Sequence, residues 1–340
     1  MNSYFSKQKK CCRRLFPAFP PAVSPEVRVL AYVTNSGGDS AADSVSVINT
    51  TTNTEILPRI PVGDNPLGIA ITPDGLRAYV TNSFYNTVSV IDTTTNMVIG
   101  NPIPVGNFPF GIAITPDGSR AYIANLVDDS VTVINTASNT EIFPRIPVGN
   151  DPVGIAITPD GSRAYVTNSF SHNVSVINTA TNTEILPRIS VGELPIGIAI
   201  TPNGSRAYVT SGFIDGTEDT VSVINIFTNT EILPRIPVGD GPRGVAITPD
   251  GSRAYVTNLA DNNISVIDTT TNTEILPRIP VGDGPIRIAI TPDGLRAYVT
   301  NIGNNNVSVI NTITNIEIFP RIPVGDFPFA IAIATIPNFI

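Results

Sequence analysis

The stretch GIAITPDGSRAYVTN, residues 154–168, decides the fold, because close copies of it recur along the whole chain. The tyrosine of its YVTN string recurs at spacings of 43 or 47 residues, at Tyr32, Tyr79, Tyr122, Tyr165, Tyr208, Tyr255 and Tyr298. A repeat of this length that is rich in Val, Ile, Tyr and Thr matches one four-stranded blade of a β-propeller. Seven copies therefore predict seven blades.

Each copy predicts four strands joined by turns. In the copy around Tyr165 they are residues 153–158, 162–168, 173–178 and 183–191. Asp-Gly in the first turn provides the backbone conformation that a tight hairpin requires. The fourth strand contains two prolines in most copies, and proline cannot donate to a strand ladder, so this strand is expected at the outer rim. In the first strand Ile155 and Ile157 alternate with small residues, which predicts that a large face of one blade packs on a small face of its neighbour.

The two ends of the chain predict how the ring closes. The chain enters at a second strand, residues 29–35, and ends just after a first strand, residues 330–335. The prediction is an all-β, seven-bladed β-propeller of four-stranded antiparallel blades, in which the C-terminal strand joins the N-terminal blade. Residues 1–28 form a basic, Pro-rich tail, and residues 29–340 form the propeller.

Charge and composition exclude several classes of function. The chain has a net charge of −8, and six of its 20 basic residues lie in the tail, so residues 29–340 carry −13. Such an acidic body repels phosphate, which argues against nucleic-acid binding. No apolar run reaches the roughly 18 residues that a transmembrane segment needs. Both cysteines, Cys11 and Cys12, lie in the tail, so the propeller has no disulfide.

The tail has three interpretations, which stay open. Its basic start followed by apolar residues resembles a secretory signal, but Pro17, Pro20 and Pro21 interrupt the apolar part. It is alternatively a disordered leader, or an anchor palmitoylated at its two cysteines.

The strings YVTN, VSVIDT and GIAITPDG resemble the YVTN-repeat seven-bladed propeller family, found in surface-layer and other exported proteins. Lactonase-like and WD40-like propellers are more distantly similar. The resemblance covers residues 29–340 and implies the fold and a location outside the cell or at its surface, with the cytoplasm as the alternative. It does not imply an activity, because propellers carry unrelated functions.

Differences among the copies point to one face of the disc. The loops between second and third strands and between fourth and first strands vary, whereas the other turns are nearly constant. Recognition is therefore expected on the variable face. Its candidate ligand-binding residues are Arg243, Arg287, His172, Phe108, Phe327 and Tyr85.

Two arginines stand closest to the expected channel. Arg243 replaces an apolar residue of the other copies, and Arg287 replaces a glycine. Two guanidinium groups suit a carboxylate or a phosphate. Pairing with Asp240 and Asp283 is the alternative, and the sequence favours it.

Acidic residues suggest one cofactor and one structural contact. The sequence implies no cofactor other than a candidate calcium ion at Asp215, Glu218 and Asp219, and solvated surface acids are the alternative. Glutamate and arginine recur four residues apart in the fourth strand, which places both on one face. Structural ion pairs are expected between Glu55 and Arg59 and between Glu184 and Arg188.

The sequence provides no recognisable catalytic set. His172 is the only histidine, and neither a Ser/His/Asp triad nor a cysteine nucleophile can be assembled. The favoured hypothesis is a monomeric, non-catalytic propeller, exported or at the cell surface, that recognises a protein, a glycan or a cation. The alternative is a lactonase-like hydrolase acting on an anionic sugar lactone at the central channel. Arg243 and Arg287 then bind the substrate, and a carboxylate or His172 activates water.

Overall fold

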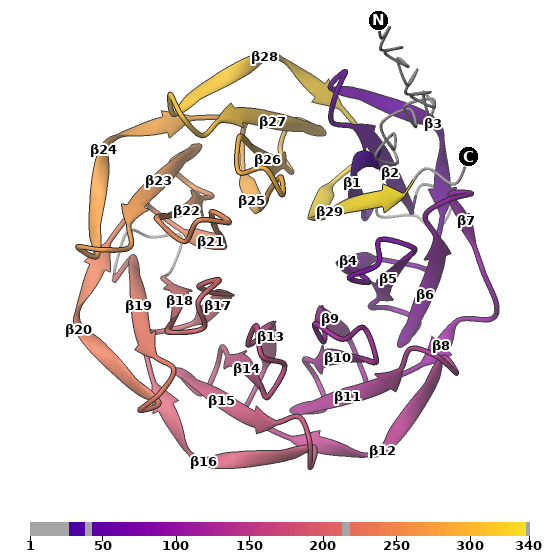
Figure 1. Ribbon diagram of the computed structural model, residues 1–340, viewed down its shortest axis with the longest axis horizontal. Coiled ribbons are helices and arrows are strands. Elements are labelled where there is room, and N and C mark those ends of the chain that lie inside the picture. Colours follow the sequence, from indigo (N-terminus) through magenta and orange to yellow (C-terminus); the bar gives the residue numbers. More distant parts are fainter. Residues whose placement is uncertain (1–26, 38–42, 213–217, 338–340) are drawn as a thin grey trace, which may run out of the picture.

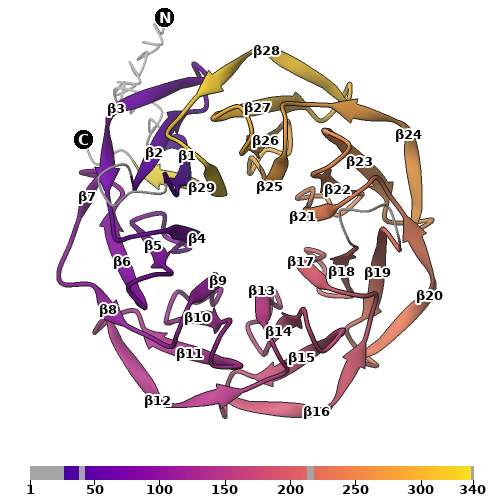
Figure 2. The same ribbon diagram turned by 180° about the vertical axis from the view of Figure 1, so that it is seen from behind.

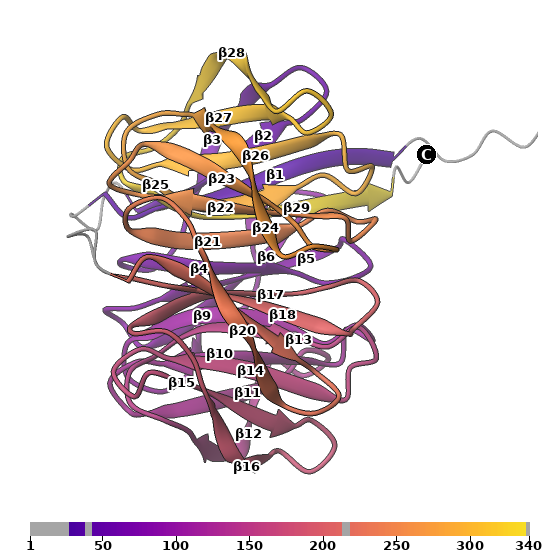
Figure 3. The same ribbon diagram turned by 90° about the vertical axis from the view of Figure 1, so that its left-hand side faces the viewer.

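The computed structural model describes residues 27–37, 43–212 and 218–337, which form a ring of four-stranded antiparallel blades (Figure 1). There are seven blades around a central channel, and the described residues contain no helix. The predicted fold is confirmed. Figures 1 and 2 show the two faces of the disc, and Figure 3 shows it from the side. No helix in the described part is long and apolar enough to cross a bilayer.

The strands fall into four concentric positions. The inner strands are β4 (Pro66–Ile71), β9 (Pro109–Ile114), β13 (Pro152–Ile157), β17 (Pro195–Ile200), β21 (Pro242–Ile247), β25 (Pro285–Ile290) and β29 (Pro328–Pro337). The second strands are β1 (Val27–Asn35), β5 (Arg77–Asn82), β10 (Arg120–Asn125), β14 (Arg163–Asn168), β18 (Arg206–Ser211), β22 (Arg253–Asn258) and β26 (Arg296–Asn301). The third strands are β2 (Ser44–Asn49), β6 (Thr87–Asp92), β11 (Ser130–Asn135), β15 (Asn173–Asn178), β19 (Thr220–Asn225), β23 (Asn263–Asp268) and β27 (Asn306–Asn311).

The outer strands contain the repeated prolines, as expected for an edge position. They are β3 (Thr54–Pro61), β12 (Thr140–Pro147), β16 (Thr183–Ser190), β20 (Thr230–Pro237), β24 (Thr273–Pro280) and β28 (Ile316–Pro323). In the remaining blade the outer strand is split into β7 (Met97–Val98) and β8 (Ile103–Pro104), and both pieces pair with β6. This copy lacks the usual Glu and Arg, which are replaced by Val98 and Pro102.

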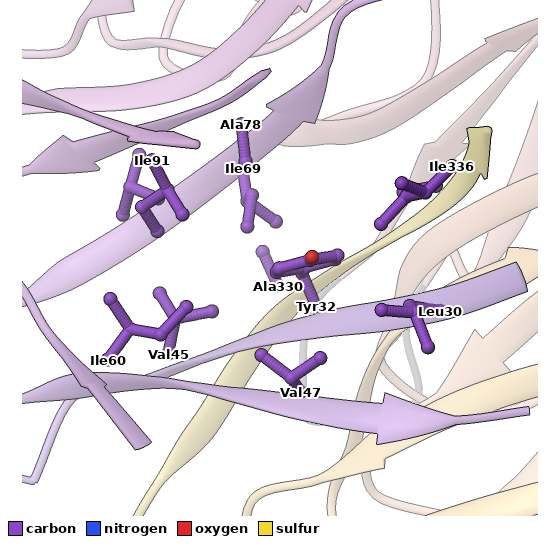
Figure 4. Packing of buried hydrophobic residues seen from close by; sticks show 12 residues of the cluster. Leu30, Tyr32, Val45, Val47, Ile60, Ile69, Ala78, Ile91, Ala330 and Ile336 are labelled. Carbon is purple, nitrogen blue, oxygen red and sulfur yellow. The ribbon is translucent and has the colours of Figure 1, made fainter. Parts of the chain in front are cut away.

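The ring closes through β1 and β29. The two strands are antiparallel, and their pairing runs from Val27 opposite Pro337 to Asn35 opposite Pro328. β1 begins at Val27, two residues before the predicted boundary. Ala330 and Ile336 of β29 pack with Leu30 and Tyr32 in one buried cluster (Figure 4).

The core consists of seven buried clusters, one between each pair of neighbouring blades. In one of them Tyr122 and Val133 of one blade pack against Ile155, Ala164 and Val166 of the next. Large inner-strand residues thus point toward the preceding blade, as the alternation in the first strand predicted.

Polar contacts between blades recur on the uniform face. The hydroxyl of Tyr79 is buried and donates to Oδ1 of Asn139 in the next blade, at 2.7 Å. Arg77 Nη1 donates to the carbonyl oxygen of Thr136 at 2.8 Å. The tyrosine contact is present in every blade, with hydroxyl–Oδ1 distances of 2.6–2.8 Å.

Glutamate and arginine of the outer strand form ion pairs at the rim. Arg59 Nε lies 2.7 Å from Glu55 Oε1, and Arg188 Nε lies 2.7 Å from Glu184 Oε1. A second contact, from Nη2 to Oε2, makes each pair bidentate. The same pair occurs in four other outer strands. Its recurrence indicates a structural contact within the edge strand and not a ligand-binding site.

Candidate functional site

The central channel contains a cavity of about 140 Å³ lined by the inner strands. Most of its wall is made of glycine backbone and aliphatic side chains, and Arg287 is the only charged residue of the lining. The cavity compares in volume with the roughly 150 Å³ space that holds a benzene molecule in a protein core.

The third residue of each inner strand stands where neighbouring blades approach most closely. It is glycine in five blades, at Gly68, Gly111, Gly154, Gly197 and Gly244. A Cβ on any of these glycines would lie 2.2–2.7 Å from a carbonyl oxygen of the next blade, which is too close for a real contact. The structural reason for the repeated glycine is therefore this approach. The other two blades have Ala330 and Arg287 at this position.

Arg287 places an unpaired charge in the channel. The side chain is half-buried, and its Nη1 atom is buried without a hydrogen-bond acceptor among the residues that the structure describes. The guanidinium lies over the ring of Phe329, with 5.5 Å from its central carbon to the ring centre. Burial, with the charge of Arg243 as a smaller contribution, lowers the pKa of Arg287 to about 10. The group therefore remains a cation at neutral pH.

Arg243 lies at the channel mouth, on the neighbouring strand β21. Its Nη1 is 3.5 Å from the carbonyl oxygens of Gly212 and Pro242. Burial lowers the pKa of Arg243, and the carboxylates of Asp219 and Asp240 act in the opposite direction. Arg243 thus has acidic neighbours, whereas within the described ranges no carboxylate counteracts the lowered pKa of Arg287.

The favoured pairing with Asp240 and Asp283 is wrong for Arg287. Asp283 accepts a hydrogen bond from Asn304 at 2.9 Å, and its charge acts on Arg321 at the rim. Among residues 27–37, 43–212 and 218–337, Arg287 forms no ion pair. Its position on the inner strand turns it into the channel and away from the loop acids.

A ring of side-chain acceptors joins the variable loops of neighbouring blades. In each blade one loop residue accepts a hydrogen bond from the backbone N–H of a residue 22 positions later, at 2.7–3.3 Å. The acceptors are Asp43, Asn86, Asp129, His172, Asp219, Asn262 and Asn305. Residues that vary in type therefore perform one structural task, which sequence comparison alone did not reveal.

His172 belongs to this ring. Its Nδ1 accepts from the N–H of Leu194 at 3.0 Å, so only Nε2 is left for another contact.

We expect His172→Asn to keep the free energy of unfolding within about 0.5 kcal/mol, because Asn occupies the same position in three other blades. His172→Ala should lower it by about 1 kcal/mol through loss of the acceptor. Urea unfolding of both variants measures this, and equal destabilisation by Asn and Ala would contradict it.

The predicted aromatic residues line none of the channel cavity. Phe108 contacts Phe84 edge-to-face at 5.9 Å and has a positive φ of 54°. Phe327 also has a positive φ, 49°, and Tyr85 is exposed. The structure brings these three residues to the variable loops but not to Arg287. Two other rings, Phe110 and Phe329, lie edge-to-face at 5.5 Å, and Phe329 contacts Arg287.

The suggested calcium residues are only partly described. Asp215 lies outside the described residues, Glu218 is exposed, and Asp219 Oδ1 accepts from the N–H of Gly241. In the described part of the chain no group of three or more His, Cys, Asp or Glu side chains is placed to hold a metal ion. Calcium binding stays a prediction.

Comparison with known families gives one match within the propeller. Residues 49–191 match the family model described as lactonase, 7-bladed beta-propeller. The match covers fewer than half of the residues and shows a similarity to lactonase propellers. A YVTN-repeat family is not among the matches, and no curated protein matches the chain.

Solved structures with the same fold have diverse names. A hydrazine synthase chain from Kuenenia stuttgartiensis is 22% identical with a TM-score of 0.71, and the alignment covers 82% of this chain and 98% of that one. A periplasmic gluconolactonase from Pseudomonas aeruginosa is 17% identical with a TM-score of 0.74, covering 92% and 100%. A functionally unknown protein from Desulfotomaculum acetoxidans is 19% identical with a TM-score of 0.76, covering 92% and 100%. At these identities the likeness shows the fold alone.

The lactonase match corrects the favoured functional hypothesis. The sequence favoured a non-catalytic propeller that recognises a protein, a glycan or a cation, because no familiar catalytic set was present. The family match instead supports the lactonase-like alternative. A missing catalytic motif does not exclude an enzyme here, because a site at the channel is built by residues from several blades and needs no contiguous motif.

Proposed function

We propose that the protein is a lactonase-like hydrolase that opens an anionic sugar lactone at the central channel. The observation that carries this proposal is the match of residues 49–191 to the lactonase propeller family. The channel adds a compatible feature, because Arg287 presents an uncompensated positive charge within a small, mostly apolar cavity. The name gluconolactonase, attached to one structure of the same fold, agrees with a sugar lactone as the substrate but does not bear on its charge.

The reaction needs a base for water and a cation for the developing oxyanion. The base takes a proton from water as the water oxygen attacks the lactone carbonyl carbon. The guanidinium of Arg243 or of Arg287 would supply this cation and stabilise the tetrahedral oxyanion. The bond between the acyl carbon and the ring oxygen then breaks, the ring oxygen takes the proton held by the base, and the new carboxylic acid loses its own proton to solvent and leaves as a carboxylate.

Two carboxylates are candidates for the base. Asp219 and Asp240 are the acids whose charges act on Arg243 at the channel mouth. Asp219 also serves as a loop acceptor, for which Asn is an adequate replacement in other blades. Asp219→Asn therefore removes the base while keeping the structural contact.

The test is hydrolysis of a panel of sugar lactones, and the acid released at constant pH measures the rate. We expect wild-type protein to exceed the buffer rate. Asp219→Asn or Asp240→Asn should lower kcat by roughly 100-fold for whichever residue is the base. Arg287→Ala should raise KM for lactones that carry a negative charge. No turnover above buffer on the whole panel would overturn the proposal.

Three finer assignments rest on the sequence alone. We infer from the repeated YVTN strings that the chain is a YVTN-repeat propeller, and from that resemblance that it is exported or at the cell surface. We also expect a monomer. Mass spectrometry of the mature N-terminus tests export, because a processed chain lacks residues of the tail.

A further inference from the structure

The unpaired guanidinium of Arg287 requires an explanation. A buried charge without a partner is costly, and natural structures rarely retain one. Five blades have glycine at this position and show that the fold does not need a side chain here. In those five blades a Cβ at this position would meet a carbonyl oxygen of the next blade. Arg287 is therefore unfavourable both sterically and electrostatically, unless a bound anion neutralises its charge.

The surroundings define what kind of group can neutralise Arg287. Its guanidinium carbon lies 5.5 Å from the centre of the Phe329 ring, and its Nη1 atom is buried without an acceptor among the described residues. The nearest charge acting on it is Arg243, which is also positive. The complement is a ligand that places a small, negatively charged acceptor group in the cavity of about 140 Å³, while the rest of the ligand extends along the channel.

The charge count favours one negative charge over two. Arg243 already has Asp219 and Asp240 as opposing charges, whereas no carboxylate among the described residues opposes Arg287. A phosphate dianion would bring a second negative charge against walls of glycine backbone and isoleucine, where it would remain unpaired. A carboxylate carries one charge, and its planar pair of oxygens fits the edge of a guanidinium.

We propose that Arg287 is the binding site for a single monovalent carboxylate in the central channel, and that Arg243 strengthens the positive potential at its entrance. This rests on the proposed function for the origin of the carboxylate, which is either a substituent of the lactone or the acid group that ring opening creates. The binding itself requires no turnover. The substrate class is thus narrowed to sugar lactones that carry no acidic group other than a carboxylate, and phosphorylated lactones are disfavoured.

Calorimetric titration tests the site without any reaction. The probes are gluconate, glucose as a neutral molecule of similar size, and inorganic phosphate at pH 8, all in buffer without chloride. We expect gluconate to bind one per chain, and glucose and phosphate to bind at least tenfold more weakly. Arg287→Gly should weaken gluconate binding about 10- to 100-fold, since it removes a charged hydrogen-bond donor.

The variants include matched controls. Arg287→Gly restores the residue of five other blades, and Arg287→Ala copies the blade that contains Ala330, so at least one is expected to fold. Arg188→Ala removes an arginine at the rim and should leave gluconate binding unchanged. Gluconate binding that is no tighter than glucose, tighter phosphate binding, or undiminished binding in both Arg287 variants would each overturn the proposal.

Turnover separates this proposal from the function on which it rests. If gluconate binds through Arg287 but no lactone is hydrolysed, the carboxylate site stands and the lactonase proposal falls. If lactones are hydrolysed but gluconate does not bind, the carboxylate site falls alone.

To locate the source of the carboxylate, glucaro-1,4-lactone, which has a free carboxylate, is compared with neutral glucono-1,5-lactone. A KM increase in Arg287→Gly only for the former indicates a substituent, and inhibition of wild-type protein by gluconate in both assays indicates the product.

Discussion

A chain that ends at Gly325 is expected not to fold into the ring. The truncation removes β29, so β1 loses its whole hydrogen-bonded partner, and the cluster around Leu30 and Tyr32 loses Ala330 and Ile336. Each lost backbone bond contributes about 0.5–1.5 kcal/mol, and burial of one isoleucine contributes about 1.5–3 kcal/mol. The total approaches the 5–15 kcal/mol that typically separates folded and unfolded protein.

Near-ultraviolet circular dichroism and calorimetry measure this loss. A chain ending at Pro337 is the length control and should melt like the full chain. A rearranged chain, in which residues 326–337 precede Val27 through a short linker, supplies the same strand as an ordinary hairpin and should fold. A melting temperature of the truncated chain within 5 °C of the full chain would contradict the closure argument.

Stability is expected to fall steeply above pH 10, because the seven repeat tyrosines are fully buried. Burial is the largest cause that raises the pKa of each of these tyrosines above the usual value of 10. The neutral form is thus favoured in the folded state. The associated stability is fully present below pH 10, the unfolded value, and is lost as the pH rises toward the folded values.

The expected size follows from the number of tyrosines. Each contributes roughly 1.4 kcal/mol of lost stability per pH unit while it ionises only in the unfolded chain. Each ionised oxygen would also face the Asn Oδ1 to which the hydroxyl donates, as Tyr79 does to Asn139. Urea unfolding between pH 8 and 11, with tyrosinate absorbance at 295 nm, measures the coupling.

Two outcomes bear on this prediction. Tyr165→Phe should make the decline shallower by about one seventh, because one titrating group is removed. Unchanged stability up to pH 11, or tyrosinate formation well before unfolding, would show that the tyrosines ionise in the folded ring.

The sequence was sufficient for the architecture because local patterns and global closure agree. Alternation in the inner strand, proline in the outer strand and the offset ends each specify the same ring. The predicted strand limits around Tyr165 differ from the observed ones by one residue at most. Because the blade sequence occurs seven times, a strand or turn that is ambiguous in one copy can be assigned from the other copies.

The channel site was less predictable from the sequence, because its contacts are between residues of different blades. Substitution of glycine identified Arg287, but stacking on Phe329 depends on side-chain direction in a different blade. His172 looked like a candidate base because it is the only histidine, whereas its neighbours in space show a shared structural task. Asp, Asn and His all accept hydrogen bonds, so the loop position varies in sequence while its role stays constant.

The repeated contacts between blades imply that blades are interchangeable parts. Since each tyrosine and each loop acceptor finds the same partner in the following blade, a chain with its blades in another order would retain these contacts. The channel site does not share this freedom, because it depends on Arg243 and Arg287 standing on consecutive inner strands. Exchanging the blades would therefore preserve the ring but separate the two arginines of the channel site.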